Sequence, residues 1–418
     1  MNAAIVGLGY VGLPLAREAV RAGLDIVGFD VNEKIVDGLN SAKSHVDDIS
    51  SDDLAEMLAS GFRATAEPAA ISQAEIVVVC VPTPLDESGG PDLKYVISSM
   101  ETIAANLRPG ATVVLESTTY PGTTEEIVKP LFEKRGLEID QDFYLAFSPE
   151  RIDPGNKTFG AKNTPKVVGG LTQMSSDRAK QFYSAFIDEV VVVAGAKEAE
   201  LAKLIENTYR HVNIALVNEM AKFCHELDIN FWDAIRAAAT KPFGFQPFYP
   251  GPGVGGHCIP IDPNYLSHSV RSKLGYPFRF VELAQEVNNS MPRYVVLRVQ
   301  ELLNENRIAL NGASVLLLGV TYKADIADQR ESPATPLAKQ LQEAGAIVTY
   351  HDPFIEEWRQ VDPPLARVDN LLAAVAQADL VILVQAHSDY NYPEIAKRAS
   401  RILDTRNAFD DSGNVEKL

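Results

Sequence analysis

A cysteine behind a glycine-rich segment is the side chain best placed for covalent chemistry. Residues 251–263 read GPGVGGHCIPIDP, so Cys258 stands just before prolines that suit the first turn of a helix. A thiol at a helix N-terminus has a lowered pKa and is the better nucleophile at neutral pH. Asp262 lies four residues on, on the same face of such a turn. The alternative is a small buried cysteine beside a structural loop, and we give that interpretation to Cys80 and Cys224, which lie in apolar stretches.

A glycine pattern near the N-terminus predicts a dinucleotide site. Residues 7–12 read GLGYVG, between an apolar strand and a helix. Gly7, Gly9 and Gly12 let the backbone turn tightly and approach a pyrophosphate, whose charge a helix N-terminus favours. Asp30 ends the next expected strand, where a carboxylate binds a ribose 2′-hydroxyl and repels a 2′-phosphate. We therefore expect NAD rather than NADP, and the alternative is a strand–helix turn that is merely tight.

Polar side chains recur at helical spacing on a long predicted helix. Lys203 and Asn207 are one turn apart and face the same way, and Arg210 follows them. A lysine on a helix is normally a solvated charge. Because this helix joins two α/β blocks, one of its faces can border the cleft between them, and we interpret Lys203 as a candidate for chemistry.

Polar loops follow several predicted strands. Thr83 lies in CVPTP (80–84) and Thr118 in ESTT (116–119), at strand ends that face the cofactor crevice in such sheets, although either segment could be ordinary turn chemistry. Lys323 in GVTYK (319–323) leaves the first strand of the third block, and Arg330 follows it. These two cations could meet phosphates or could belong to a basic surface loop.

The elements that must position these groups fall into three blocks. The first alternates strands and helices, which implies a parallel sheet covered by helices. The second is helical, with helices expected at Glu198–Leu227, Phe231–Ala239 and Pro277–Glu305, the last interrupted near Pro292. The third returns to α/β. The strands expected in the first and third blocks are Ala3–Val6, Asp25–Asp30, Ile76–Val81, Thr112–Glu116, Tyr144–Phe147, Val190–Val193, Ser314–Gly319, Ile347–Tyr350, Leu380–Val384 and Arg401–Leu403.

This layout predicts an α/β fold of two Rossmann-like, doubly wound parallel sheets joined by a central helical region with a long helix. We expect a cofactor domain at 1–195, a central helical domain at 196–305 and a third domain at 306–418.

Composition narrows the function classes. The chain has 418 residues and a formal net charge of −18, which disfavours nucleic-acid binding. No apolar run approaches the length of a membrane helix, and no signal peptide is visible. Three cysteines cannot form a disulfide framework, so a cytoplasmic location is expected. An acidic protein that binds an anionic substrate then needs a few local Lys or Arg residues.

Together these segments resemble the UDP-glucose/GDP-mannose dehydrogenase family over nearly the whole chain. The resemblance implies an NAD domain, a central dimerisation region and a nucleotide-sugar domain, with two-step oxidation of the sugar C6 alcohol to the acid by two NAD⁺. The run GGHCIP around Cys258 resembles members that act on UDP-N-acetylhexosamines, and FSPERIDPGN at 147–156 resembles the UDP-N-acetylglucosamine 6-dehydrogenase group. UDP-N-acetylmannosamine and UDP-glucose remain alternative substrates. The partners expected are a UDP-sugar and a second copy of the chain, which forms a homodimer through the central helices.

The resemblance also assigns roles to residues. Cys258 adds to the aldehyde to give a thiohemiacetal and then a thioester, while Lys203 and Asn207 serve the alkoxide and oxyanion. Asp262 and Glu150 are candidates to activate water, and Thr118 to hold it. No metal is expected. The residues implied at NAD are Gly7, Gly9, Tyr10, Val11, Gly12, Asp30, Lys34, Thr83, Thr118 and Arg330; those implied at the nucleotide sugar are Arg151, Ile152, Lys203, Asn207, Arg210, Lys241, Gly255, Tyr322, Lys323 and Arg406.

Two competing functions share part of this pattern. A two-electron hydroxy-acid dehydrogenase has the NAD fold and a helical second domain, but needs neither Cys258 nor a third α/β block. A non-catalytic sensor of NAD or of a nucleotide sugar needs the binding loops without Lys203, Asn207, Cys258 and Asp262.

Overall fold

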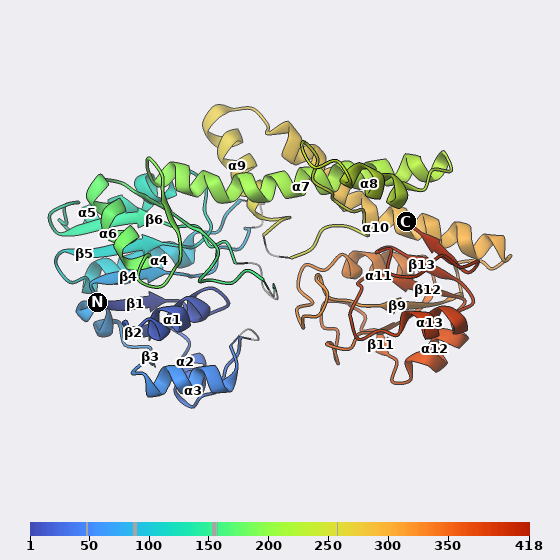
Figure 1. Ribbon diagram of the computed structural model, residues 1–418, viewed down its shortest axis with the longest axis horizontal. Coiled ribbons are helices and arrows are strands. Elements are labelled where there is room, and N and C mark those ends of the chain that lie inside the picture. The colour runs from blue at the N-terminus through green and yellow to red at the C-terminus, as the bar shows by residue number, and fades with distance from the viewer. Residues whose placement is uncertain (47–48, 87–89, 153–155, 157, 257) are drawn as a thin grey trace. The chain divides into compact units, whose positions relative to one another are not determined.

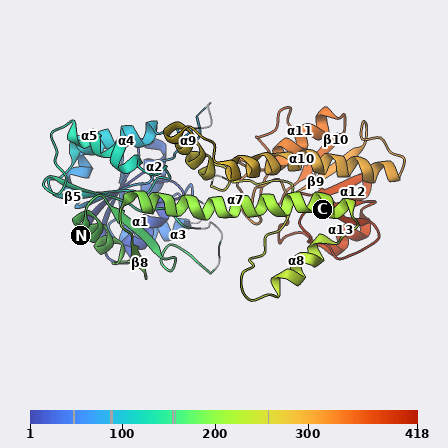
Figure 2. The same cartoon turned by 90° about the horizontal axis from the view of Figure 1, so that it is seen from above.

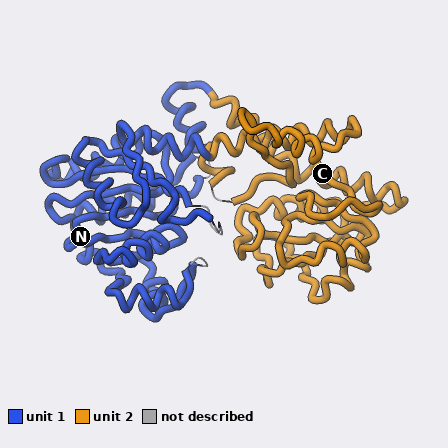
Figure 3. Tube along the Cα trace, in the orientation of Figure 1, with its two compact units in different colours: residues 1–206, 264–276 blue, residues 207–263, 277–418 orange. Residues whose placement is uncertain are grey.

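The computed structural model describes residues 1–418 except 47–48, 87–89, 153–155, 157 and 257. The chain divides into two compact units (Figure 3). Unit 1 comprises residues 1–206 and 264–276, and unit 2 comprises residues 207–263 and 277–418.

The described residues of unit 1 form one eight-stranded sheet, in the order β3-β2-β1-β4-β5-β6-β7-β8 (Figure 1). Neighbouring strands are parallel except β6 and β7, which pair antiparallel. The strands are β1 (Asn2–Val6), β2 (Asp25–Phe29), β3 (Arg63–Thr65), β4 (Ile76–Val79), β5 (Ala111–Leu115), β6 (Phe143–Phe147), β7 (Lys166–Gly170) and β8 (Val190–Val192). The helices are α1 (Gly12–Arg21), α2 (Glu33–Asn40), α3 (Ser51–Ala59), α4 (Lys94–Asn106), α5 (Lys129–Glu133) and α6 (Gln173–Tyr183), with a short 3₁₀-helix η1 (Pro68–Gln73) and a short π-helix η2 (Thr124–Val128).

The central strands of this sheet are apolar throughout because both faces are covered. All four residues of β4 and all five of β5 are buried, as is usual in parallel sheets with helices on both sides. One core packs α1 and α6 against the sheet, and a second core on the other strand residues packs α4, with Val96, Met100 and Ile103.

Unit 2 contains a six-stranded sheet among its described residues, in the order β11-β10-β9-β12-β13-β14, with every neighbouring pair parallel. One core lies under α10 and α11, which pack against each other (Figures 1 and 2), and the other lies under α12 and α13. The strands are β9 (Ser314–Leu318), β10 (Ile347–His351), β11 (Ala366–Arg367), β12 (Leu380–Leu383), β13 (Ile402–Asp404) and β14 (Val415–Lys417), and the helices are α10 (Arg279–Glu305), α11 (Ala334–Glu343), α12 (Leu371–Gln377) and α13 (Tyr392–Arg398). The predicted fold class, two doubly wound α/β units with a long helix, is confirmed.

The central helices are α7 (Ala196–Glu226), α8 (Phe231–Ala239) and α9 (Asp262–Leu274), together with α10. The prediction that the helix before Glu305 is interrupted near Pro292 is wrong, because α10 continues through that residue. A proline removes one backbone hydrogen bond from a helix. Here Met291, Pro292, Val295 and Val299 are all buried, and this packing keeps the helix continuous. None of the helices in the described part of the chain has the length and apolar character needed to cross a membrane.

Candidate active site

The glycine turn of unit 1 has a different constraint at each glycine. Gly7 follows β1 with φ +90°, and a Cβ on it would lie 2.8 Å from the Cys80 carbonyl oxygen. A Cβ on Gly12 would lie 1.9 Å from the Gly7 oxygen, so only glycine lets α1 approach β1 so closely. A Cβ on Gly9 would meet no atom of the described residues within 4 Å. Gly7 and Gly12 therefore allow the close backbone contacts of the turn, and Gly9 leaves open space beside the backbone.

Asp30 fixes this turn from the end of β2. Its Oδ2 accepts the Leu8 N–H at 3.0 Å, and its Oδ1 accepts the Asn32 N–H at 2.9 Å. Among the described residues no side chain caps the N-terminus of α1. These features fit NAD: the uncapped start of α1 suits a pyrophosphate, Gly9 leaves room for it, and a partly exposed carboxylate suits a ribose.

The other residues predicted at NAD differ in their surroundings. Thr83 is half-buried, and its carbonyl accepts the hydroxyl hydrogen of Tyr265 from α9. Thr118 and Val11 are partly buried, Tyr10 is 44% exposed, and Lys34 is exposed in the first turn of α2. Arg330 belongs to unit 2, where its guanidinium pairs with Asp328.

Cys258 is the exposed cysteine of the three. It lies in a turn directly before α9, and its carbonyl accepts the Asp262 N–H at 2.9 Å. Asp262 is the first residue of α9 and is buried, and its Oδ2 accepts a hydrogen bond from the Asn207 Nδ2 at 2.6 Å. Unit 2 thus brings together three of the predicted catalytic residues: an accessible sulfur, a buried carboxylate and a buried amide.

The other two cysteines are unsuited to nucleophilic attack. Burial raises the pKa of the Cys80 thiol well above its ordinary value, and nearby Glu116 adds to the rise. Burial also raises the pKa of Cys224, which packs in the core between α7 and α8. A neutral thiol is a poor nucleophile, so the prediction that these two are structural agrees with their surroundings.

Lys203 and Glu150 meet in unit 1. Both side chains are at least nine-tenths buried, and the Lys203 ammonium donates to the carbonyl oxygen of Glu150. The Glu150 carboxylate accepts the Ile152 N–H through Oε1. Arg151 turns away from them: its Nη1 donates to the Pro165 carbonyl, and its Nη2 pairs with Glu206.

In unit 2 several residues predicted at the nucleotide sugar pack around one glycine segment. A Cβ on Gly255 would lie 2.6 Å from the Glu331 oxygen and 2.8 Å from the Tyr322 Cβ. The Arg406 Nη1 would lie 2.9 Å from a Cβ on Gly251, and burial lowers the pKa of Arg406 to about 10. Lys323 is partly buried, whereas Arg210 and Lys241 are exposed, the latter over the Phe243 ring. Glycines 251 and 255 thus let the backbone approach Arg406 and Tyr322.

Sequence reasoning missed a buried charged cluster beside Glu150. Lys166 pairs with Glu116 at 2.9 Å, and the Tyr183 hydroxyl donates to the same carboxylate. It also missed Thr119, which is fully buried with an Oγ1 that has no hydrogen-bond partner among the described residues. The sequence contains one signal for the charged cluster. Lys166 begins the apolar run KVVGG (166–170), and a charge in a buried strand needs a partner of opposite charge.

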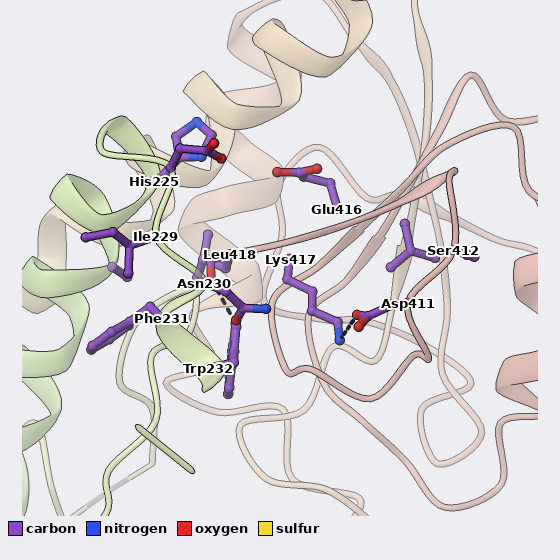
Figure 4. A pocket seen from close by; sticks show the side chains of 13 residues that line it. His225, Ile229, Asn230, Phe231, Trp232, Asp411, Ser412, Glu416, Lys417 and Leu418 are labelled. Atoms are coloured by element: carbon purple, nitrogen blue, oxygen red, sulfur yellow. Dashed lines mark hydrogen bonds and ion pairs between the residues drawn. The ribbon is translucent and has the colours of Figure 1, made fainter. Parts of the chain in front are cut away.

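A pocket of about 300 Å³ opens elsewhere in unit 2, between the end of α7, the start of α8 and β14 (Figure 4). His225, Trp232 and Glu416 line it, and Lys417 pairs there with Asp411 at 2.5 Å. None of the predicted site residues is among those that line it in the described part of the chain. This pocket is therefore separate from the candidate active site.

Three family models match the chain in order. They are the NAD-binding domain (residues 1–187), the central domain (197–290) and the UDP-binding domain (316–411) of the UDP-glucose/GDP-mannose dehydrogenase family.

Individual relatives cover nearly the whole chain. A UDP-N-acetyl-D-mannosamine dehydrogenase of Methanocaldococcus jannaschii is 34% identical over 97% of this chain and 92% of its own length. A UDP-N-acetyl-D-glucosamine 6-dehydrogenase of Pseudomonas aeruginosa is 37% identical over 85% of this chain and 83% of its own length. The solved structure of a UDP-D-ManNAc dehydrogenase from Pyrococcus horikoshii superposes with a TM-score of 0.91 at 31% identity, covering 100% of this chain and 99% of that one.

Proposed function

Because the chain belongs to the UDP-glucose/GDP-mannose dehydrogenase family, with NAD as cofactor and a UDP-sugar as substrate, we propose that it oxidises the C6 alcohol of a UDP-N-acetylhexosamine to the carboxylate. UDP-N-acetylglucosamine is the substrate we propose. The observation that carries the proposal is the exposed Cys258 beside the buried Asp262–Asn207 pair, because a simple two-electron dehydrogenase needs no such nucleophile.

The sulfur is needed for the second half of the oxidation. NAD⁺, held by the glycine turn and Asp30, would supply the hydride acceptor for both halves of the oxidation. An aldehyde carbon yields that second hydride only after a nucleophile has added to it. The Cys258 thiolate adds to the aldehyde to give a thiohemiacetal, hydride loss gives a thioester, and water replaces the sulfur to give the acid and the thiolate again. The covalent bond also prevents the aldehyde from escaping.

Lys203 and Asn207 serve the oxygen on C6. They are one turn apart on α7, so one helix supplies a cation and an amide donor. A cation beside a developing oxyanion stabilises it, and loss of one such donor typically lowers the rate by about 10²–10³. Glu150 and Asp262 are the carboxylates proposed to take the proton of the hydrolytic water, with Thr118 holding that water.

The remaining assignments concern binding. We propose that the glycine turn and Asp30 hold NAD together with Tyr10, Val11, Lys34, Thr83, Thr118 and Arg330. We propose that Arg151, Ile152, Arg210, Gly255, Tyr322, Lys323 and Arg406 hold the UDP-sugar. The Lys and Arg side chains in these two sets would supply the positive charge that a chain with a net charge of −18 needs in order to bind a pyrophosphate. The corresponding functional domains are 1–195, 196–305 and 306–418.

The choice of hexosamine rests on two sequence runs. GGHCIP surrounds Cys258, and FSPERIDPGN spans 147–156. His257 and residues 153–155 lie outside the described residues. Relatives named for mannosamine and for glucosamine substrates match about equally well, which leaves UDP-N-acetylmannosamine as the second candidate.

We further propose a homodimer formed through the central helices. On the unit 2 parts of these helices, large apolar side chains are exposed, as expected for a surface that a second copy covers. The exposed residues on α7 and α10 are Tyr209, Leu216, Phe223, Phe280, Leu283 and Leu297. Lys241 lies in the exposed segment that follows α8, from which it would reach the partner's nucleotide sugar. None of the three cysteines takes part in a disulfide, which supports a reducing, cytoplasmic location.

The test is the amount of NADH formed per sugar, measured with four substrates: UDP-N-acetylglucosamine, UDP-N-acetylmannosamine, UDP-N-acetylgalactosamine and UDP-glucose. We expect two NADH per molecule, with the highest kcat/KM for UDP-N-acetylglucosamine. Cys258→Ala should abolish acid formation while NAD binding is retained, and Cys224→Ala is the matched control. One NADH per substrate, or normal turnover by the Cys258 variant, excludes the covalent mechanism.

A further inference from the structure

A buried cluster of charged side chains lies behind Glu150, and the proposed reaction does not yet use it. Glu116 directly follows β5, Lys166 is the first residue of β7, and Tyr183 is the last residue of α6. The Lys166 Nζ lies 2.9 Å from Glu116 Oε2 and 4.0 Å from Glu150 Oε2. The Tyr183 hydroxyl donates to Glu116 Oε1. A row of carboxylate, ammonium and carboxylate thus runs from the core of unit 1 to a proposed site residue.

This row is costly to bury. Glu116 is 1% exposed, Lys166 5% and Glu150 8%, so water solvates none of them well. Burial raises the pKa of Glu116, and the Lys166 ammonium beside it opposes that rise. Apolar side chains of similar volume usually serve a core at least as well as a buried ion pair does. Stability alone is therefore a poor reason for these residues, and a role at the site explains them better.

The row reaches the reaction through Glu150. Its carbonyl oxygen accepts the Lys203 ammonium, and its Oε1 accepts the Ile152 N–H. The second carboxylate oxygen, Oε2, is the one that faces Lys166. The Lys203 ammonium therefore holds the backbone of Glu150, while the Glu150 carboxylate lies between the Ile152 N–H and the Lys166 ammonium.

We propose that Lys166, oriented by Glu116 and Tyr183, is a positioning residue that aims the Glu150 carboxylate for hydrolysis of the thioester. The inference rests on the proposed function. In that step the water oxygen bonds to the thioester carbon, the carbon–sulfur bond breaks, the sulfur leaves as the Cys258 thiolate, and the water proton passes to Glu150. Lys166 touches none of the reacting atoms and acts through Glu150.

The experiment compares Lys166→Met with Lys166→Arg, which keeps the charge, and with Lys180→Met, an exposed lysine on α6. Kinetics with NAD⁺ and the UDP-hexosamine are followed before and during steady state. For Lys166→Met we expect two rapid NADH per site, then turnover slowed about 100-fold while the thioester accumulates, because general-base catalysis contributes about 10²–10⁴. The KM for the sugar should change less than twofold. Lys166→Arg should recover most of the rate.

The pH profile separates positioning from mere packing. A cation within about 4–6 Å favours the charged carboxylate by about 1–3 pH units, so the acid limb of kcat should move up by about one unit in Lys166→Met. In Glu116→Gln, where Lys166 keeps only Glu150 as its acidic partner in the cluster, the limb should stay or move down. A Lys166→Met profile that coincides with the wild-type profile overturns the inference, and so does an upward shift in Glu116→Gln.

Thermal melting supplies a readout without turnover. Without Lys166, two buried carboxylates take up protons on folding, so the melting temperature of Lys166→Met should fall more steeply between pH 5 and 8 than that of Lys180→Met. Equal slopes for Lys166→Met and Lys180→Met overturn the charge coupling. The melting comparison still applies if Lys166→Met is too unstable for kinetics and only Glu116→Gln and Lys166→Arg can be assayed. Absence of NADH formation by the wild type with every UDP-hexosamine overturns the proposed function instead, while the melting comparison still decides the coupling.

Discussion

In unit 1, Gly7 follows β1 with φ +90°, and Leu8, the next residue, donates its N–H to Asp30 Oδ2 at 3.0 Å. In unit 2, Gly319 follows β9 with φ +76°, and Val320, the next residue, donates its N–H to Asp352 Oδ2 at 2.7 Å. Each aspartate follows the neighbouring strand, β2 or β10, and its Oδ1 accepts the N–H two residues on. The two sheets therefore begin with the same hydrogen-bonded turn.

Beyond the turn, the two units differ. In unit 1 the chain enters α1 at Gly12, and Asp30 stays partly exposed. In unit 2 residues 321–333 precede α11, and Asp352 is fully buried against the His387 Nε2 at 3.0 Å. The turn by itself is thus structural. An open carboxylate and a glycine that admits a helix N-terminus are the features for which we propose the turn of unit 1 as the dinucleotide site.

The strongest test of this comparison substitutes the glycines. Gly12→Ala and Gly319→Ala each place a Cβ within 2.3 Å of a backbone oxygen, so we expect each to lower the free energy of unfolding by more than about 3 kcal/mol. A Cβ in Gly9→Ala meets no atom within 4 Å in the described part of the chain, so this variant should keep its stability while NAD affinity falls. Urea unfolding and NAD titration check these outcomes, and equal destabilisation by all three substitutions contradicts them.

The two units should also differ in their pH dependence. Burial raises the pKa of Glu200 to about 7, although the Gly122 N–H and the Thr124 N–H and hydroxyl donate to it. A raised pKa means that its contribution is full below about pH 4.5 and is lost as pH rises through 7, an effect of about 2–3 kcal/mol. Glu200→Gln should remove this slope. Stability measured by urea unfolding from pH 5 to 8, wild type against variant, checks it.

In unit 2 the pKa of a different buried acid, Asp352, is shifted in the opposite direction. Burial acts against its charge, but His387 and the Val320 and Phe354 N–H groups outweigh burial and hold the pKa of Asp352 below its ordinary value. Its contribution is therefore present above about pH 4 and is lost only in acid. Between pH 5 and 8 it is constant, so Glu200 alone of the two sets a slope there.

A smaller effect separates the two aspartates. Asp352→Asn removes the nearer of the two carboxylates beside the buried His387 and should lower stability by about 1–2 kcal/mol. Asp30→Asn takes the acceptor from either the Leu8 or the Asn32 N–H at a partly exposed site, so it should lower stability by about 0.5–1 kcal/mol. It should also weaken NAD binding about tenfold, since a charged acceptor contributes about 1.5–3 kcal/mol to a hydrogen bond. Thermal melting and NAD titration of both variants check this. A loss of NAD affinity in Asp352→Asn alone contradicts the assignment of the cofactor to unit 1.

Much of this arrangement was predictable from the sequence. The strands β1 and β9 follow from short apolar runs that end at a glycine, β4 follows from the apolar run at 76–81, and Asp30 follows from its spacing after Gly12. Cys258, Asp262 and Asn207 were each predicted among the catalytic residues, although no local pattern shows that Asp262 is buried against Asn207. That contact joins residues 55 apart in the chain.

Two features were out of reach for the same physical reason. The Glu116–Lys166–Glu150 row joins the ends of β5, β6 and β7, and β7 pairs antiparallel with β6, a register that periodicity does not reveal. The continuity of α10 through the buried Pro292 depends on packing of its neighbours Met291 and Val295 in a core shared with distant strands. Local propensity is overridden in both places by tertiary contacts.

The smallest expected effect concerns the loop that unit 2 inserts after its turn. Arg330 is about half exposed and pairs with Asp328, so Arg330→Ala should change stability by less than about 0.5 kcal/mol. If this loop serves both ligands as proposed, the same variant weakens NAD binding several-fold, whereas Lys323→Ala weakens UDP-sugar binding instead. Calorimetric titration of each variant with NAD⁺ and with UDP distinguishes the two. If both variants lose affinity for UDP and neither loses affinity for NAD⁺, the whole inserted loop belongs to the nucleotide-sugar site. NAD is then bound by the open turn of unit 1 without help from this loop, and the functional difference between the two turns is larger than proposed.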